Sequence, residues 1–128
     1  MTILLDSHAV IWFLTGDRRC SATARNVIEN EAGDVLVSAA SAWEIATKAR
    51  LGRWPEAVAV LADLQQVLAE NDFGTLDVTM EHSLLAGMLP GRHGDPFDRM
   101  LAAQARIEGV PLVTTDPVFR AFDIQTVW

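Results

Sequence analysis

The chain has 128 residues, of which 50% are hydrophobic, and a mean hydropathy of +0.19, so it can bury the core of one domain and is not intrinsically disordered. The net charge of −7, from 10 basic and 17 acidic residues, argues against non-specific nucleic-acid binding by the field of the whole protein but does not exclude a nucleic-acid enzyme. One cysteine excludes an internal disulfide, and no signal peptide or membrane span is recognisable, so we expect one cytoplasmic domain over residues 1–128.

Strand-like and helix-like segments alternate along the chain. The expected strands cover residues 2–6, 35–37, 75–78, 110–114 and 124–127. The expected helices cover residues 7–14, 21–31, 41–51, 55–68, 80–88 and 96–108, with a short helical turn after residue 116. This alternation predicts an α/β fold, a three-layer α/β/α sandwich with a central parallel sheet of four to five strands.

Acidic residues occur where buried strands give way to helices. Asp6 closes the run 3–5, Asp116 closes the run 111–115, Asp98 lies in the first turn of the helix after residue 96, and Glu44 lies one turn past the strand 35–37. In α/β sheets, ligands bind outside the carboxyl ends of the strands. Carboxylates that converge there without cysteine ligands indicate a site for a hard divalent cation.

Each of these acids also has a structural explanation. Asp95 before Pro96, and Asp116 before Pro117, are well placed as helix N-caps, and Asp6 or the residue after it can cap the first helix. Capping does not require the acids to share one end of a sheet, so the set favours a metal site. The two roles are compatible, because a helix N-terminus favours the ionised carboxylate that a cation needs.

Four stretches taken together resemble the PIN-domain ribonucleases, specifically the VapC-type toxins of toxin–antitoxin pairs. They are Leu4 to Ala9 with Trp12, Ser38 to Lys48, His93 to Arg99, and Thr114 to Asp116. Each stretch alone is a weak motif. Their order and separations in a chain of this length make a strong signal that runs nearly end to end.

The resemblance implies a PIN-like fold and metal-dependent cleavage of RNA phosphodiester bonds. The acidic quartet of the family falls on Asp6, Glu44, Asp98 and Asp116. Asp6, Asp98 and Asp116 would hold Mg²⁺, or Mn²⁺, directly or through water, and Glu44 would orient the attacking water or join a second metal. The family also implies a small cognate antitoxin and a homodimer, with RNA as substrate and no membrane association.

Several further polar residues are candidates for supporting the acids or contacting substrate: Asp95, Thr115, Lys48, Arg99 and Ser38. Lys48 stands one turn from Glu44, where a phosphate contact and a plain salt bridge both fit. His8 is expected to cap or pack more than to act chemically. Trp43 is expected in the core or at an interface, and Trp54 is expected to be exposed because it precedes Pro55 in a turn.

Two other functions use the same pattern. A non-catalytic binding module with this fold would keep the acids only as caps. An aspartyl-phosphate phosphotransfer domain also places an acid after a buried strand, but a dehalogenase-type site needs Asp-x-Asp where this chain has Asp6-Ser7-His8. A receiver domain needs a lysine after a late strand, and Lys48 is the only lysine of the chain.

Overall fold

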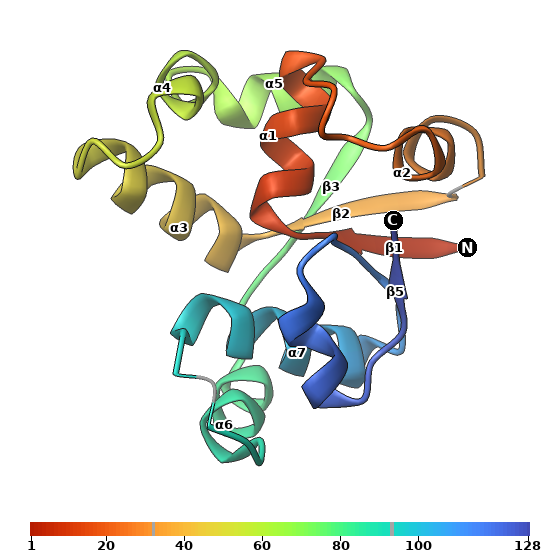
Figure 1. Ribbon diagram of the computed structural model, residues 1–128, viewed down its shortest axis with the longest axis vertical. Coiled ribbons are helices and arrows are strands. Elements are labelled where there is room, and N and C mark those ends of the chain that lie inside the picture. The colour runs from red at the N-terminus through yellow and green to blue at the C-terminus, as the bar shows by residue number, and fades with distance from the viewer. Residues whose placement is uncertain (32, 93) are drawn as a thin grey trace.

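The sheet is formed by five parallel strands in the order β3-β2-β1-β4-β5 (Figure 1), in a computed structural model that describes residues 1–31, 33–92 and 94–128. Their bounds are Thr2–Leu5 (β1), Asp34–Ser38 (β2), Phe73–Leu76 (β3), Leu112–Val113 (β4) and Thr126–Val127 (β5). The first strand of the chain is therefore the central one. Leu5 lies opposite both Val37 and Val113, so three strands end at the same level.

Helices cover both faces of the sheet, and the predicted α/β/α sandwich is confirmed. In Figure 1, α1, α4 and α5 lie on one side of the strands, whereas α6 and α7 lie on the other. The helices are α1 (Ser7–Thr15), α2 (Ala22–Asn26), α3 (Ala39–Arg50), α4 (Pro55–Leu61), α5 (Leu64–Glu70), α6 (Met80–Met88) and α7 (Pro96–Glu108). A π-helical turn, η1 (Val27–Glu31), extends α2, and a 3-10 helix, η2 (Pro117–Phe122), follows β4.

Two hydrophobic layers follow from the alternation of side chains along β1. Ile3 and Leu5 pack with residues of α1, α2, α4 and α5, whereas Leu4 packs with residues of α6, α7 and η2. All three side chains are fully buried. None of the described helices combines the length and the apolar character needed to cross a bilayer.

The structure departs from the sequence predictions between residues 54 and 68. The single helix expected over 55–68 is two helices, α4 and α5, that meet at Ala62 and Asp63. Across this break Leu64 and Leu68 are buried whereas Val58 is 54% exposed, so the apolar residues of the two helices do not form one continuous buried stripe. The prediction for Trp54 was wrong, since it is 4% exposed. Trp43 is 64% exposed and so is not in the core, and its place at an interface stays a prediction.

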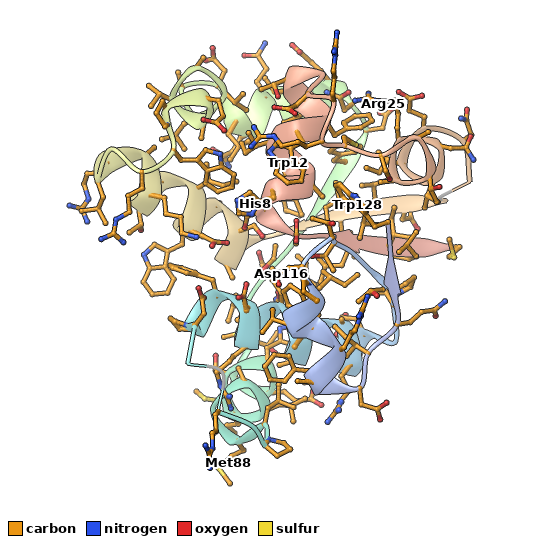
Figure 2. The ribbon with its side chains drawn as sticks, viewed as in Figure 1. His8, Trp12, Arg25, Met88, Asp116 and Trp128 are labelled. Atoms are coloured by element: carbon orange, nitrogen blue, oxygen red, sulfur yellow. The ribbon has the colours of Figure 1, made fainter. Side chains whose placement is uncertain are left out.

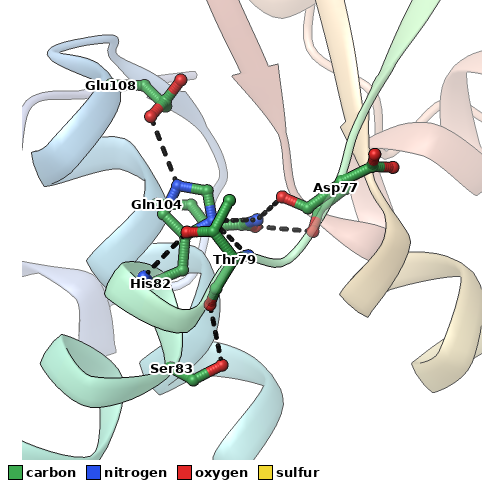
Figure 3. A network of polar contacts seen from close by, with 7 residues as sticks. Asp77, Thr79, His82, Ser83, Gln104 and Glu108 are labelled. Atoms are coloured by element: carbon green, nitrogen blue, oxygen red, sulfur yellow. Dashed lines mark hydrogen bonds and ion pairs between the residues drawn. The ribbon is translucent and has the colours of Figure 1, made fainter.

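A buried polar network joins the second hydrophobic layer to the sheet (Figure 3). His82 and Thr79 cap α6 reciprocally, each backbone N–H donating to the side chain of the other at 3.1 Å. The amide nitrogen of Gln104, on α7, donates to the carbonyl of Asp77 at 3.2 Å, and its amide oxygen accepts from the Ser38 hydroxyl. Gln104 is fully buried, so this network fixes α7 against the junction of β2 and α3.

Candidate active site

The four acids of the predicted quartet line one cavity of about 110 Å³. It opens at the carboxyl ends of β1, β2 and β4, where α1, α3 and η2 begin. Helix α7 adds its N-terminus from the other layer. The lining residues are Asp6, Ser7, His8, Glu44, Lys48, Asp95, Asp98, Leu101 and Asp116. Five carboxylates and one ammonium group thus face a common space.

Asp6 is held in place by two donors. One carboxylate oxygen accepts from the backbone N–H of Ala9 at 2.8 Å, which makes Asp6 the N-cap of α1. The other oxygen accepts from the hydroxyl of Thr114. The Thr114 hydroxyl in turn accepts from the backbone N–H of Asp116 at 3.1 Å. One chain of hydrogen bonds therefore links the end of β1 to the turn after β4.

The pKa of Asp6 is raised from its ordinary value of 3.8 to about 6. Burial is the main cause, because Asp6 is 6% exposed and its charged form is poorly solvated. The hydrogen bonds from Thr114 and Ala9 oppose this effect, and the negative charges of Glu44 and Asp98 add to it. Like charges crowded against a buried carboxylate are the electrostatic setting that a bound cation would relieve.

Glu44 is buried at 4% exposure, with a partner for each carboxylate oxygen. One oxygen accepts from the Ser7 hydroxyl at 2.5 Å, and the other accepts from Lys48 Nζ at 2.5 Å. Lys48 therefore forms the salt bridge that its spacing predicted, while its side chain remains 30% exposed at the rim of the cavity. Both oxygens of Glu44 are fixed, and an added ligand would share them with these donors.

The acids of α7 have different positions relative to the helix end. Asp95 is the N-cap, and one of its oxygens accepts from the N–H groups of Phe97 at 2.8 Å and Asp98 at 3.2 Å. Asp98 follows in the first turn, where the helix dipole favours a negative charge. Asp116 caps η2 by accepting from the Val118 N–H at 3.0 Å. Asp95 therefore caps α7, and both Asp95 and Asp98 line the cavity.

Three of the proposed supporting residues are not among those that line this cavity. Ser38 caps α3 through the Ala40 N–H and donates to Gln104, so it belongs to the buried network. Arg99 donates to the carbonyls of Ala86, Gly87 and Leu89 and thereby ties α7 to the end of α6. Thr115 is exposed, and the hydroxyl beside the last acid is that of Thr114. His93, which begins one of the motifs, lies outside the described residues.

His8 is more involved in the site than the sequence indicated. It lies two residues after Asp6, lines the cavity and is exposed. Its ring packs 4.5 Å from that of Trp54 and 5.2 Å from that of Trp12, measured between centroids. Its partial desolvation by the surrounding groups lowers the pKa of His8. The signal that could have found it is its place in the first turn of α1, directly after the cap Asp6 and so at the same edge of the sheet as the acids.

The oxygen-rich donor set fits a hard divalent cation held largely through water. Among the described residues, no three His, Cys, Asp or Glu side chains lie close enough together to hold a metal ion directly. Mg²⁺ keeps several waters and needs only one or two protein carboxylates. A cavity of about 110 Å³ with five carboxylates on its wall suits a hydrated ion of this kind.

Comparisons with known proteins agree with this architecture. The family model of the PIN domain matches residues 3–125. Ribonuclease VapC22 of Mycobacterium tuberculosis is 39% identical over 121 residues, which cover 94% of this chain and 91% of that protein. Solved structures also share the fold. VapC20 of M. tuberculosis, described as a sarcin-ricin loop cleaving toxin, has a TM-score of 0.69 at 18% identity over 95% of each chain. VapBC2 of Rickettsia felis, solved with a promoter DNA fragment, has a TM-score of 0.66 at 13% identity over 98% of this chain and 97% of that one.

Proposed function

The chain belongs to the PIN domain family, and we propose on that basis that it is a metal-dependent endoribonuclease, the toxin of a toxin–antitoxin pair. The observation that carries the proposal is the cavity in which Asp6, Glu44, Asp98 and Asp116 meet at the carboxyl edge of the sheet. The relative at 39% identity, which is a ribonuclease by name, supports the same reaction. VapBC structures among the folds most like this one support the assignment as a toxin.

The cation of the proposed site is Mg²⁺, with Mn²⁺ as the alternative, held by Asp6, Asp98 and Asp116 in part through water. When bound, it would polarise the phosphate, lower the pKa of a bound water and stabilise the leaving oxygen. Within the chain, Thr114 and the Ala9 N–H hold the Asp6 carboxylate in one orientation.

The remaining polar groups orient water and substrate in this proposal. Ser7 and Lys48 fix both oxygens of Glu44, so that its carboxylate has a defined direction from which to orient the attacking water. The partly exposed ammonium group of Lys48 can also offset the charge of an incoming phosphate. Asp95 acts as the cap that sets the start of α7 and thereby the place of Asp98.

The proposed partners are a small cognate antitoxin and a second copy of the chain. Structural neighbours described as toxin–antitoxin complexes support the antitoxin. Large apolar side chains exposed on α3 and α6 support an assembly that covers part of this surface. They are Trp43, Met80, Leu84 and Met88, with exposed fractions from 64% to 81%.

The proposal is tested by incubating the purified protein with total RNA, with Mg²⁺ or with excess chelator. Asp6→Asn and Asp98→Asn should each lower the cleavage rate on the order of a hundredfold, because each removes a charge facing the cation. Asp63→Asn is the matched control, since this exposed acid at the start of α5 lies outside the cavity. Cleavage that persists in chelator, or at the unmodified rate in both cavity variants, would contradict the proposal.

A further inference from the structure

A second cavity of about 380 Å³ adjoins the acidic one. The two share His8 and Lys48 on their walls. The rest of the second wall comes from α1, the loop after it, the turn between α3 and α4, and the start of α4. Its residues there are Trp12, Arg19, Arg53, Trp54 and Glu56. We refer to this space as the basic cavity, because three of its lining residues are lysine or arginine and one is acidic.

The sizes of the two cavities differ in a way that matters for a ligand. About 110 Å³ accommodates an ion, its waters and phosphate oxygens, but leaves little room for a nucleobase. About 380 Å³ falls within the range of sites that bind small organic molecules. A nucleotide strand that places one phosphate among the acids must put its neighbouring sugar and base elsewhere. The basic cavity is the adjoining space with enough volume.

The shared wall of the two cavities carries an exposed ring. His8 is exposed, whereas Trp54 and Trp12, against which its ring packs, are 4% and 9% exposed. The two tryptophans therefore support the imidazole from behind and keep it in place. Figure 2 shows His8 and Trp12 along α1, with Asp116 below them in this view. A supported, exposed ring beside a phosphate site is a surface on which a base can stack.

The cations of the basic cavity are not all neutralised by the chain. Arg19 is paired with Asp17 at 2.8 Å and Glu56 at 3.3 Å, and Lys48 is paired with Glu44. Arg53 is exposed, and within the described part of the chain its side chain has no hydrogen bond or ion pair. A single-stranded nucleic acid supplies both things that this wall lacks, a phosphate for the guanidinium group and a base for the ring.

We propose that the basic cavity binds the RNA nucleotide next to the scissile phosphate, with Arg53 contacting its phosphate and His8 stacking on its base. This inference rests on the proposed function, because the acidic cavity must hold the scissile phosphate. It goes further by assigning a site for substrate recognition to the turn between α3 and α4. An acidic peptide tail could also reach Arg53, but it would leave the ring of His8 without a stacking partner.

The test measures binding in the non-cleaving Asp98→Asn background, with a fluorescein-labelled single-stranded RNA 12-mer of mixed sequence. Its affinity is followed by anisotropy between about 50 and 200 mM salt. Loss of one phosphate contact in single strands reduces the slope of log affinity against log salt by about 0.7. Arg53→Ala should produce this reduction and weaken binding severalfold. Arg50→Ala is the matched control, because this exposed arginine ends α3 outside the cavity.

His8 is tested in the same assay by two substitutions. His8→Ala should weaken RNA binding roughly fivefold or more without changing the salt slope, because stacking does not release counterions. His8→Phe should retain most of the affinity, since it keeps a flat ring. Circular dichroism at the assay temperature confirms that each variant is folded, and Arg53→Ala, at an exposed turn, tests the cavity independently of His8.

The outcomes separate this inference from the proposed function. If the slope of log affinity against log salt is equal for Arg53→Ala and Arg50→Ala, the proposed nucleotide site is refuted. Cleavage at the acidic cavity would not be affected by this result. RNA binding that depends on Arg53, in a protein that cleaves no RNA, would overturn the proposed function instead. An Arg53→Ala variant that binds RNA normally but loses affinity for an acidic peptide would assign the cavity to a protein ligand and refute the inference.

Discussion

Replacing Asp6 by asparagine should stabilise the folded protein at neutral pH, even though it removes the residue that caps α1. The carboxyl group has a pKa of about 6 in the folded chain and an ordinary value of 3.8 when unfolded. Ionising it therefore weakens folding by up to about 3 kcal/mol once the pH exceeds 6. Asparagine carries no charge, and its amide oxygen can still accept from the Ala9 N–H.

The sign of the pH dependence follows from the same two values. Between about pH 4 and 6 the folded chain holds a proton on Asp6 that the unfolded chain has released, so folding takes up a proton. The contribution of Asp6 to stability is thus most favourable below pH 4 and is lost as the pH rises through 6. The advantage of Asp6→Asn should be largest at pH 7 and vanish near pH 3.5.

Urea unfolding at several pH values measures this difference as a change in midpoint at constant slope. Asp17→Asn serves as a control with the opposite sign, because Arg19 lowers the pKa of Asp17 to about 2. That variant should lose stability above about pH 4. Mg²⁺ should stabilise the unmodified protein and not Asp6→Asn, since a cation favours the ionised form.

An Asp6→Asn protein that is less stable at pH 7, by the same margin at every pH, would refute this reasoning. It would mean that the hydrogen bonds from Thr114 and Ala9 offset the effect of burial on the pKa of Asp6, and that the loss comes from a contact of the side chain that asparagine does not replace.

Two further substitutions test the buried polar contacts. Lys48→Met should lower the unfolding free energy by about 2 kcal/mol, because it removes one of the two side chains that donate to the buried carboxylate of Glu44 and leaves the Ser7 hydroxyl. Adding Glu44→Gln to this variant should restore most of the lost unfolding free energy, as measured by urea unfolding. Strictly additive losses from the two substitutions would contradict an energetic coupling between Lys48 and Glu44. Gln104→Leu should cost about 2 kcal/mol or more, since it leaves the Ser38 hydroxyl without its acceptor. An unchanged urea midpoint for this variant would show that the network contributes little.

From the sequence, the residues that meet at the ends of the strands could be predicted better than the contacts and exposure of residues on the helices. Asp6, Glu44, Asp98 and Asp116 could be placed together because parallel strands end at a common edge, which fixes where the next residues lie. This argument needs only the order of the elements. To predict the hydrogen-bond partners of each acid, the register of the strands is needed as well. The pairing of Thr114 with Asp6, for example, depends on the register of β1 and β4.

Residues whose roles depend on tertiary packing were not predictable in this way. Arg99 follows Asp98, yet its guanidinium group reaches the carbonyls at the end of α6, which lies in another part of the sequence. Trp54 stands in a turn but is buried by His8 and the neighbouring helices. Helical periodicity alone could not divide α4 from α5, because both halves carry apolar residues at suitable spacing.

The hydrogen bond between Thr114 and Asp6 joins residues that are 108 positions apart. Glu44 is synthesised early, but β1 lacks one of its two neighbouring strands, and Asp6 lacks its hydroxyl partner, until the polypeptide has grown past residue 114. Closing so long a loop is entropically costly and comes late in folding. A nascent chain on the ribosome therefore carries an incomplete site. For a protein proposed to cut RNA, this order of assembly delays activity until the polypeptide has been synthesised past Thr114.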